Sequence, residues 1–179
     1  MSKLRDGMIG PVVILCTICL ITTLAMAVTS EIAAPLIEAQ RRSPIEVIVF
    51  EGMPPPESFV EFTDERLPGE VLEAYMTPDG SHFVVMTRTR GWSGQVIFFV
   101  AMDAQGNYVK IIMGDNTETP GIGNRVADPA YLELFYGQND PFAADAVTGA
   151  TVTARALWAA LGAANEAFEL MVSSAPIAP

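Results

Sequence analysis

The sequence predicts an α+β domain with an antiparallel sheet and flanking helices, preceded by an N-terminal transmembrane helix. Residues 9–29 carry no charged side chain. In the whole 179-residue chain, half of the residues are apolar and 17% are charged. Four short β-rich segments follow between residues 70 and 114. Helix-like segments come only after them, and strands followed by helices indicate an α+β architecture.

The first element is the apolar segment 9–29, with the sequence IGPVVILCTICLITTLAMAVT. A helix of this length spans the hydrocarbon core of a bilayer. A cleaved signal peptide is the alternative, because Ala25-Met-Ala27 resembles a cleavage site. We expect a retained anchor, since the apolar run is longer than a typical signal-peptide core.

The charges place residues 1–8 in the cytoplasm. Lys3 and Arg5 precede the apolar segment, and the positive-inside rule then puts everything after residue 29 outside the cytoplasm. Residues 1–42 have a net charge of +1 and residues 43–179 have a net charge of −12, which together give the −11 of the chain. Such an acidic domain without a basic patch is a poor nucleic-acid binder.

Metal and hydrolase chemistry receive little support. Cys16 and Cys19 both lie in the apolar segment, where we interpret them as small apolar side chains and not as a metal or redox pair. His82 is the only histidine, and a structural role is expected for it. No metal site and no catalytic residue is therefore predicted.

Residues 30–56 are expected to form a juxtamembrane helix and a connector before a domain that spans 57–179. Residues 30–42 continue the helical pattern, and Ser43-Pro44 ends it. The run IEVIVF at 45–50 is β-rich, and a proline-rich segment follows it.

The β-rich segments predict a sheet, and two of them are joined by the short sequence AQG, which is typical of a tight hairpin. The predicted strands are 70–77, 82–89, 95–103 and 107–114.

Two helices are predicted after a loop. Asp128-Pro129 has the pattern of a helix start, with an N-cap acid and proline at the first helical position, and Gly137 fits its end. The terminal helix begins near Thr151 and carries an apolar stripe. The stripe consists of Val152, Ala156, Ala159, Ala163, Ala167 and Leu170.

The start of the terminal helix has a composition that suits an anion. The sequence DAVTGAT at 145–151 precedes it, and Thr148, Thr151 and Thr153 supply hydroxyls. Free backbone N–H groups and the helix dipole favour a phosphate at such a position, and Gly149 and Ala150 allow a ligand close to the backbone. The alternative is a threonine that caps the helix behind a glycine turn.

The sequence DAVTGAT also resembles the flavinylation motif of the FMN-binding domain family, which occurs in a flavin-bearing component of the Rnf electron transport complex and in its relative from the Na⁺-translocating NADH:quinone reductase. In that family the last threonine of the motif is esterified to the phosphate of FMN by a flavin transferase. The resemblance implies covalent FMN on Thr151.

Two further motifs resemble the same family in the same order. ETPGIG at 118–123 is similar to a family loop beside the flavin, and GWSG at 91–94 is similar to a glycine-aromatic motif before a hairpin. The chain departs from the family pattern at Ala146 and Ile122, where Gly and Leu are usual, and it has DNT before Glu118 where His is common. None of these departures removes Thr151.

The resemblance implies roles for the residues of these motifs. Glu118 and Thr119 would line the flavin, and Gly121 and Gly123 would bring backbone amides near its ring system. Trp92 would stack on the ring, with a buried core position as the alternative.

Two charged residues receive less specific roles. Asp145 would orient Thr151 or bind a metal during flavin transfer, or it would only end the loop. Arg125 is a candidate for offsetting charge on the flavin.

The resemblance further implies an electron-relay component of an ion-translocating ferredoxin:NAD oxidoreductase of the Rnf type, anchored in the cytoplasmic membrane with its domain on the periplasmic side. Its partners would be the other components of the complex, the flavin transferase and the bilayer around 9–29. The related component of the reductase is a second interpretation, although the short chain favours the Rnf type. A flavin- or phosphate-binding regulatory module and a purely structural assembly protein also remain open.

Overall fold

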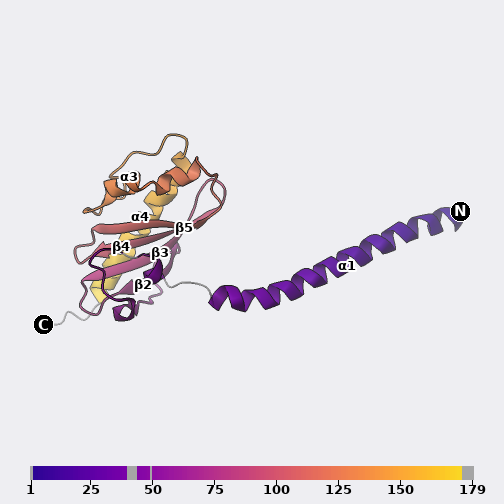
Figure 1. The fold of residues 1–179 in the computed structure, drawn as a ribbon, viewed down its shortest axis with the longest axis horizontal. Helices are drawn as coiled ribbons and strands as arrows, with labels where there is room; N and C mark the ends of the chain where they lie inside the picture. The colour runs from indigo at the N-terminus through magenta and orange to yellow at the C-terminus, as the bar shows by residue number, and fades with distance from the viewer. Residues whose placement is uncertain (1, 40–43, 49, 175–179) are drawn as a thin grey trace. The chain divides into compact units, whose positions relative to one another are not determined.

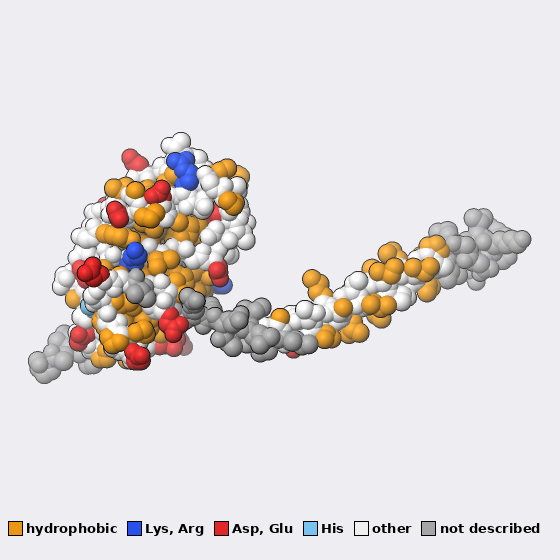
Figure 2. Space-filling view, viewed as in Figure 1, with side chains coloured by type: hydrophobic (Ala, Val, Ile, Leu, Met, Phe, Trp, Pro, Cys, Tyr) orange, Lys and Arg blue, Asp and Glu red, His pale blue; other side chains and the backbone are white. Residues whose placement is uncertain are grey.

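The computed structural model describes residues 2–39, 44–48 and 50–174. The chain divides into two compact units, residues 1–41 and 42–179. Helix α1 (Ser2–Ala39) forms most of the first unit. Its segment Gly10–Glu31 is long and apolar enough to cross a membrane, which is also a property of N-terminal signal sequences. Figure 2 shows hydrophobic side chains along this segment. The helix continues through Pro35, as expected for residues 30–39.

The second unit contains a five-stranded antiparallel sheet in which each strand pairs with its neighbour in sequence (Figure 1). The four predicted strands are confirmed to within two residues at each end. The additional strand has two residues, too few to show a pattern in the sequence. The strands are β1 (Val60–Glu61), β2 (Val71–Met76), β3 (His82–Arg90), β4 (Gln95–Asp103) and β5 (Tyr108–Asn116).

The central strand β3 is buried on both faces of the sheet. Phe83 and Val85 belong to one hydrophobic core, and Val84 and Met86 belong to another. Because successive side chains of a strand point to opposite faces, the continuous apolar run of β3 serves both cores. The predicted hairpin between β4 and β5 is confirmed by a turn in which the amide of Gly106 donates to the carbonyl of Asp103.

The helices that follow the sheet cover one of its faces, the first face, which carries Phe83 and Val85. Figure 1 shows this for α4 (Thr151–Ser174). The predicted helix after Asp128 is present but is split into two short pieces. Asp128 caps it as expected, because its carboxylate accepts from the amide of Ala130 at 3.0 Å. The pieces are α3 (Pro129–Leu132) and η3 (Glu133–Phe135), and the 3₁₀ helix η2 (Gly123–Ala127) precedes them.

The predicted apolar stripe of α4 is partly wrong. Val152 and Ala159 are exposed, and Leu170 is only half-buried. The buried face carries longer side chains instead, since burying them removes more apolar surface from water. These are Leu157, Leu161 and Met171. Alanines occur on several sides of the helix, so they did not identify its buried face.

The β-rich run at 45–50 forms no strand where it is described. Residues 44–47 form the short helix α2 (Pro44–Val47), while Ser43 and Val49 lie outside the described residues. Ile45 and Ile48 are three positions apart, lie on one side of this turn and are buried against the second face of the sheet. The compact unit therefore begins well before residue 57, and η1 (Pro56–Ser58) lies within it.

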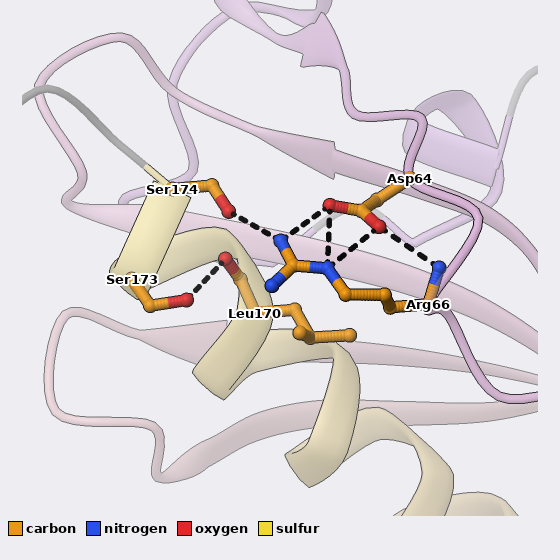
Figure 3. A network of polar contacts seen from close by, with 5 residues as sticks. All are labelled: Asp64, Arg66, Leu170, Ser173 and Ser174. Carbon is orange, nitrogen blue, oxygen red and sulfur yellow. Dashed lines mark hydrogen bonds and ion pairs between the residues drawn. The ribbon is translucent and has the colours of Figure 1, made fainter.

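A small polar network joins the segment before β2 to the end of α4 (Figure 3). The guanidinium of Arg66 lies 2.7 Å from the carboxylate of Asp64, and its Nη2 donates to the hydroxyl of Ser174 at 3.4 Å. The hydrogen bond from Arg66 lowers the pKa of Asp64 to about 2. His82 has the expected structural setting, with Nδ1 2.9 Å from the hydroxyl of Ser81.

Candidate functional site

The start of α4 presents backbone donors that no other described residue uses. The amide of Ala154 makes the first bond of the helix, to the carbonyl of Ala150 at 2.8 Å. Among the described residues, the amides of Thr151, Val152 and Thr153 make no hydrogen bond. This is the arrangement that favours an anion at a helix N-terminus.

No described threonine caps this helix. Within the part of the chain that the structure describes, the hydroxyls of Thr148 and Thr151 accept no backbone N–H, so the capping alternative does not hold. The turn before the helix is closed by the amide of Ala150, which donates to the carbonyl of Val147 at 2.9 Å. Gly149 lies between them with φ of 85°, a conformation that a residue with a Cβ adopts only with strain. Thr151 itself is exposed, and its hydroxyl makes no bond to a described residue.

Glu118 connects the three motif segments. Its carboxylate is 6% exposed and accepts two hydrogen bonds, from the amide of Ser93 at 3.0 Å and from the hydroxyl of Thr153 at 2.7 Å. Ser93 belongs to the 91–94 segment and Thr153 to the first turn of α4. One buried carboxylate therefore fixes both segments relative to the loop at 117–123.

Two glycines give Glu118 its space. A Cβ at Gly91 would collide with Oε1 of Glu118, and a Cβ at Gly123 would collide with its Oε2. A side chain at either position would displace the Glu118 carboxylate from its two donors, which gives a reason for a glycine in each of two separate motifs.

The three segments surround a cavity of about 300 Å³, at the lower end of the range for small-molecule sites. Its mouth carries two exposed apolar side chains, since Trp92 is 74% exposed and Ile122 is 52% exposed. Trp92 is consequently not a core residue, and that alternative is wrong. The cavity is lined by Trp92, Glu118, Thr119, Ile122, Gly123, Gly149, Ala150, Thr151, Val152 and Thr153.

The amides of Gly121 and Gly123, which were expected to approach the flavin, already have acceptors within residues 119–124. The amide of Gly121 donates to the side chain of Asn124 at 2.6 Å, and the amide of Gly123 donates to the carbonyl of Thr119 at 3.0 Å. Gly123 lines the cavity, whereas Gly121 does not. Neither glycine therefore has a free amide to offer to a flavin in this structure.

Besides Gly121, three predicted site residues lie outside the cavity. Arg125 donates from Nη1 to the carbonyl of Thr148 at 3.0 Å and so ties η2 to the turn before α4. Thr148 is exposed, and its contact with Arg125 is made through this carbonyl and not through its hydroxyl. Asp145 is exposed and makes no hydrogen bond to Thr151, so nothing in this geometry orients that hydroxyl through Asp145.

Sequence reasoning missed the partners of Glu118. Thr153 was expected only as a hydroxyl near the helix start, and Ser93 was not singled out. The available signal was that Ser93 belongs to the 91–94 motif and that Thr153 follows the 145–151 motif by two residues. Across residues 2–39, 44–48 and 50–174 no group of His, Cys, Asp and Glu side chains is placed to hold a metal ion.

The donor set suits a ligand with a phosphate and a flat ring. The unpaired amides at the start of α4 suit a phosphate, and the Thr151 hydroxyl lies at the same place. Trp92 and Ile122 offer apolar surface on which a ring can pack. The residues present therefore fit a flavin mononucleotide.

Comparison with known families gives the same class of ligand. Residues 91–166 match the model of the family described as the FMN-binding domain. The matched range includes every residue that lines the cavity. A search of curated proteins finds no match for this chain. The domain match supports a flavoprotein that binds FMN, in agreement with the fold of antiparallel sheet and flanking helices.

Proposed function

We propose that this chain is a membrane-anchored flavoprotein that carries FMN covalently on Thr151 and relays electrons within an ion-translocating oxidoreductase of the Rnf type. The bound FMN supplies the ability to accept and pass on electrons. The chain supplies the attachment point, the pocket and the anchor.

The observation that carries this proposal is the position of Thr151. Its hydroxyl makes no bond to a described residue, and it lies in the cavity at a helix start whose first amides are unpaired. An ester between Thr151 Oγ1 and the phosphate replaces the hydroxyl hydrogen and removes one water overall. The product keeps one negative charge, which the free amides and the helix dipole stabilise.

The surrounding residues hold the site in shape. Glu118 fixes the 91–94 segment, so that Trp92 stays at the mouth of the cavity. Arg125 binds the carbonyl of Thr148 and adds a positive charge beside the turn that carries the attachment point. Thr119 and Val152 complete the wall.

The anchor gives a reason for the covalent bond. Gly10–Glu31 is suited to hold the chain in the cytoplasmic membrane, with the domain on the outer side. A cofactor that dissociates outside the cytoplasm is lost to the cell, whereas an ester bond retains it. The other components of the complex would provide the ion path, and a flavin transferase would form the ester.

Fluorescence on a denaturing gel tests the attachment. The full chain is expressed with a flavin transferase, denatured and viewed under ultraviolet light. We expect a fluorescent band for the wild type and none for Thr151→Val, which replaces the hydroxyl with a methyl group of similar size. A fluorescent Thr151→Val band would contradict attachment at this residue.

Thr148→Val is the matched control. It makes the same change three residues away, outside the cavity, and the band is expected to remain. A band that is lost in Thr148→Val and kept in Thr151→Val would place the attachment point at Thr148. A wild-type signal that disappears on denaturation would show that FMN is not covalently bound.

A further inference from the structure

Glu118 is the only charged side chain that is buried among the residues that the structure describes. The other buried polar side chains of the described residues are all threonines. Burying a charge is costly unless a countercharge or strong hydrogen bonds compensate it. Because Glu118 lies in the wall of the cofactor cavity, its charge acts on whatever the cavity binds.

No cation compensates this carboxylate. In the part of the chain that the structure describes, Glu118 makes no ion pair with a Lys, Arg or His side chain. Its two contacts come from neutral donors, the amide of Ser93 and the hydroxyl of Thr153. Neutral donors stabilise a carboxylate, but they leave its net charge in place.

Little water reaches the carboxylate. The backbone at Gly91 and Gly123 packs so closely against it that a Cβ at either position would collide with one of its oxygens. The side chain is 6% exposed. Solvent therefore screens the field of Glu118 much less than it screens the field of a surface charge.

The structural role of Glu118 does not require the charge. A glutamine at this position has the same shape, and its carbonyl oxygen can accept from the amide of Ser93 while its amide group donates to the hydroxyl of Thr153. It would avoid the cost of burying a charge. The presence of an acid at this place therefore points to a role of the charge itself.

The described lining of the cavity contains no other charged residue. Arg125 is exposed and lies outside the lining, so solvent screens its charge. The free amides and the dipole of α4 favour an anion, but in the proposed function the phosphate occupies them. A ring packed against Trp92 and Ile122 therefore shares the cavity with one uncompensated negative charge.

A negative charge appears on the ring of a flavin when the ring takes up two electrons and one proton. A buried anion in the same cavity repels that charge and has little effect on the neutral oxidised ring. We propose that Glu118 lowers the reduction potential of FMN held in this cavity and so makes the bound cofactor a stronger electron donor. This role rests on the proposed function only in that FMN occupies the cavity, and it does not require the ester at Thr151.

Binding of oxidised and reduced FMN tests this role without the ester. The full chain is expressed without a flavin transferase, kept in detergent and titrated by calorimetry with oxidised FMN and, in the absence of oxygen, with dithionite-reduced FMN. We expect the wild type to bind the oxidised form more tightly. In Glu118→Gln the reduced form should gain about tenfold in affinity relative to the oxidised form, because the repulsion is removed.

The same change is measurable as a potential. A tenfold change in the ratio of the two dissociation constants raises the two-electron potential of bound FMN by about 30 mV. Spectroelectrochemical titration of the flavinylated chain, in the wild type and in Glu118→Gln, measures this shift.

Asp115→Asn is the matched control, because it removes the same charge at an exposed position outside the cavity. The ratio of the two dissociation constants is expected to stay as in the wild type. Thr153→Val removes one donor and keeps the charge of Glu118, so it is expected not to strengthen the binding of reduced FMN relative to oxidised FMN.

Four results would overturn the proposal. One is a wild type that binds reduced FMN more tightly than oxidised FMN. Another is an unchanged ratio in Glu118→Gln, including the case in which this variant only slows reduction, which would assign Glu118 to proton delivery. The third is an equal change in Asp115→Asn. The fourth is an equal gain in Thr153→Val, because the shape of the site and not the charge would then set the ratio.

The role of Glu118 and the attachment at Thr151 are separable. Loss of the wild-type band on the denaturing gel, with the expected change of the ratio in Glu118→Gln, would concern only the ester. A fluorescent band with an unchanged ratio would remove only the role of Glu118.

Discussion

The hydroxyl of Thr153 donates a 2.7 Å hydrogen bond to Oε2 of Glu118, a carboxylate that is 6% exposed and 35 residues earlier in the chain. The other oxygen of Glu118 accepts from the amide of Ser93. This pair of contacts brings the first turn of α4 and the segment that carries Trp92 to the same cavity. The shape of the candidate site therefore depends on one buried acid.

Removing the Thr153 hydroxyl is expected to destabilise the domain. In Thr153→Val the shape is nearly kept, but Glu118 loses one of its two donors in a buried place, at a cost of about 1–3 kcal/mol. Urea unfolding of the full chain in detergent, followed by circular dichroism, measures the loss. Thr153→Ser keeps a hydroxyl and should remain close to the wild type, whereas equal stability of the valine variant would show that the bond contributes nothing.

Adding a methyl group at Gly123 is expected to disturb the site and not only the fold. The new Cβ would collide with Glu118, which must then move away from Ser93 and Thr153. We expect Gly123→Ala to lose at least about 1 kcal/mol of stability, as overpacking typically costs, and to carry less FMN. Gly69→Ala is the control, because its Cβ would meet no atom within 4 Å and its φ is not positive. Equal flavin content in the two variants would argue against a role for the Glu118 contacts.

Gly162→Ala is expected to stabilise the domain. Gly162 lies inside α4, and a Cβ there would meet no atom within 4 Å. Alanine is favoured over glycine in a helix interior by up to about 1 kcal/mol, partly because the unfolded chain loses freedom. A raised urea midpoint is the expected result, and a lowered one would mean that this side of the helix is more closely packed than the structure shows.

The Asp64–Arg66 contact predicts a small pH dependence of stability. The hydrogen bond from Arg66 lowers the pKa of Asp64 from 3.8 to about 2 in the folded chain. A lowered folded pKa stabilises the fold above the unfolded pKa, and this contribution is lost as the pH falls through the folded pKa. The wild type should therefore exceed Asp64→Asn in urea midpoint at pH 6, with the difference shrinking between pH 4 and about pH 2. A difference that stays constant across this range would assign the effect to something other than the charge of Asp64.

The sheet could be predicted from the sequence because its strands are short apolar runs between clear turns. Helix α2 could not, since Ile45 and Ile48 occur in a run that suits a strand equally well. The spacing of three between these isoleucines, after a proline suited to a first helical position, was the only local sign of a helix. Packing against the second face of the sheet decided between the two structures.

The members of the site could be predicted more completely than their contacts. The motifs contained most residues that line the cavity, including Thr151 and Trp92. The hydrogen bonds of Glu118 join residues 25 and 35 positions away, so they depend on how the sheet and α4 pack. The same packing turns the glycines at 91 and 123 toward Glu118, a role that no local pattern indicates.

The central claim is that the phosphate of FMN is esterified to Oγ1 of Thr151. Peptide mass spectrometry tests this claim most directly. The full chain, purified after expression with a flavin transferase, is digested and the peptide that covers residues 146–155 is fragmented. The account predicts a mass increase equal to FMN less one water, located on Thr151. An unmodified peptide from a fully flavinylated preparation, or the same increase located on Thr148 or Thr153, would contradict it.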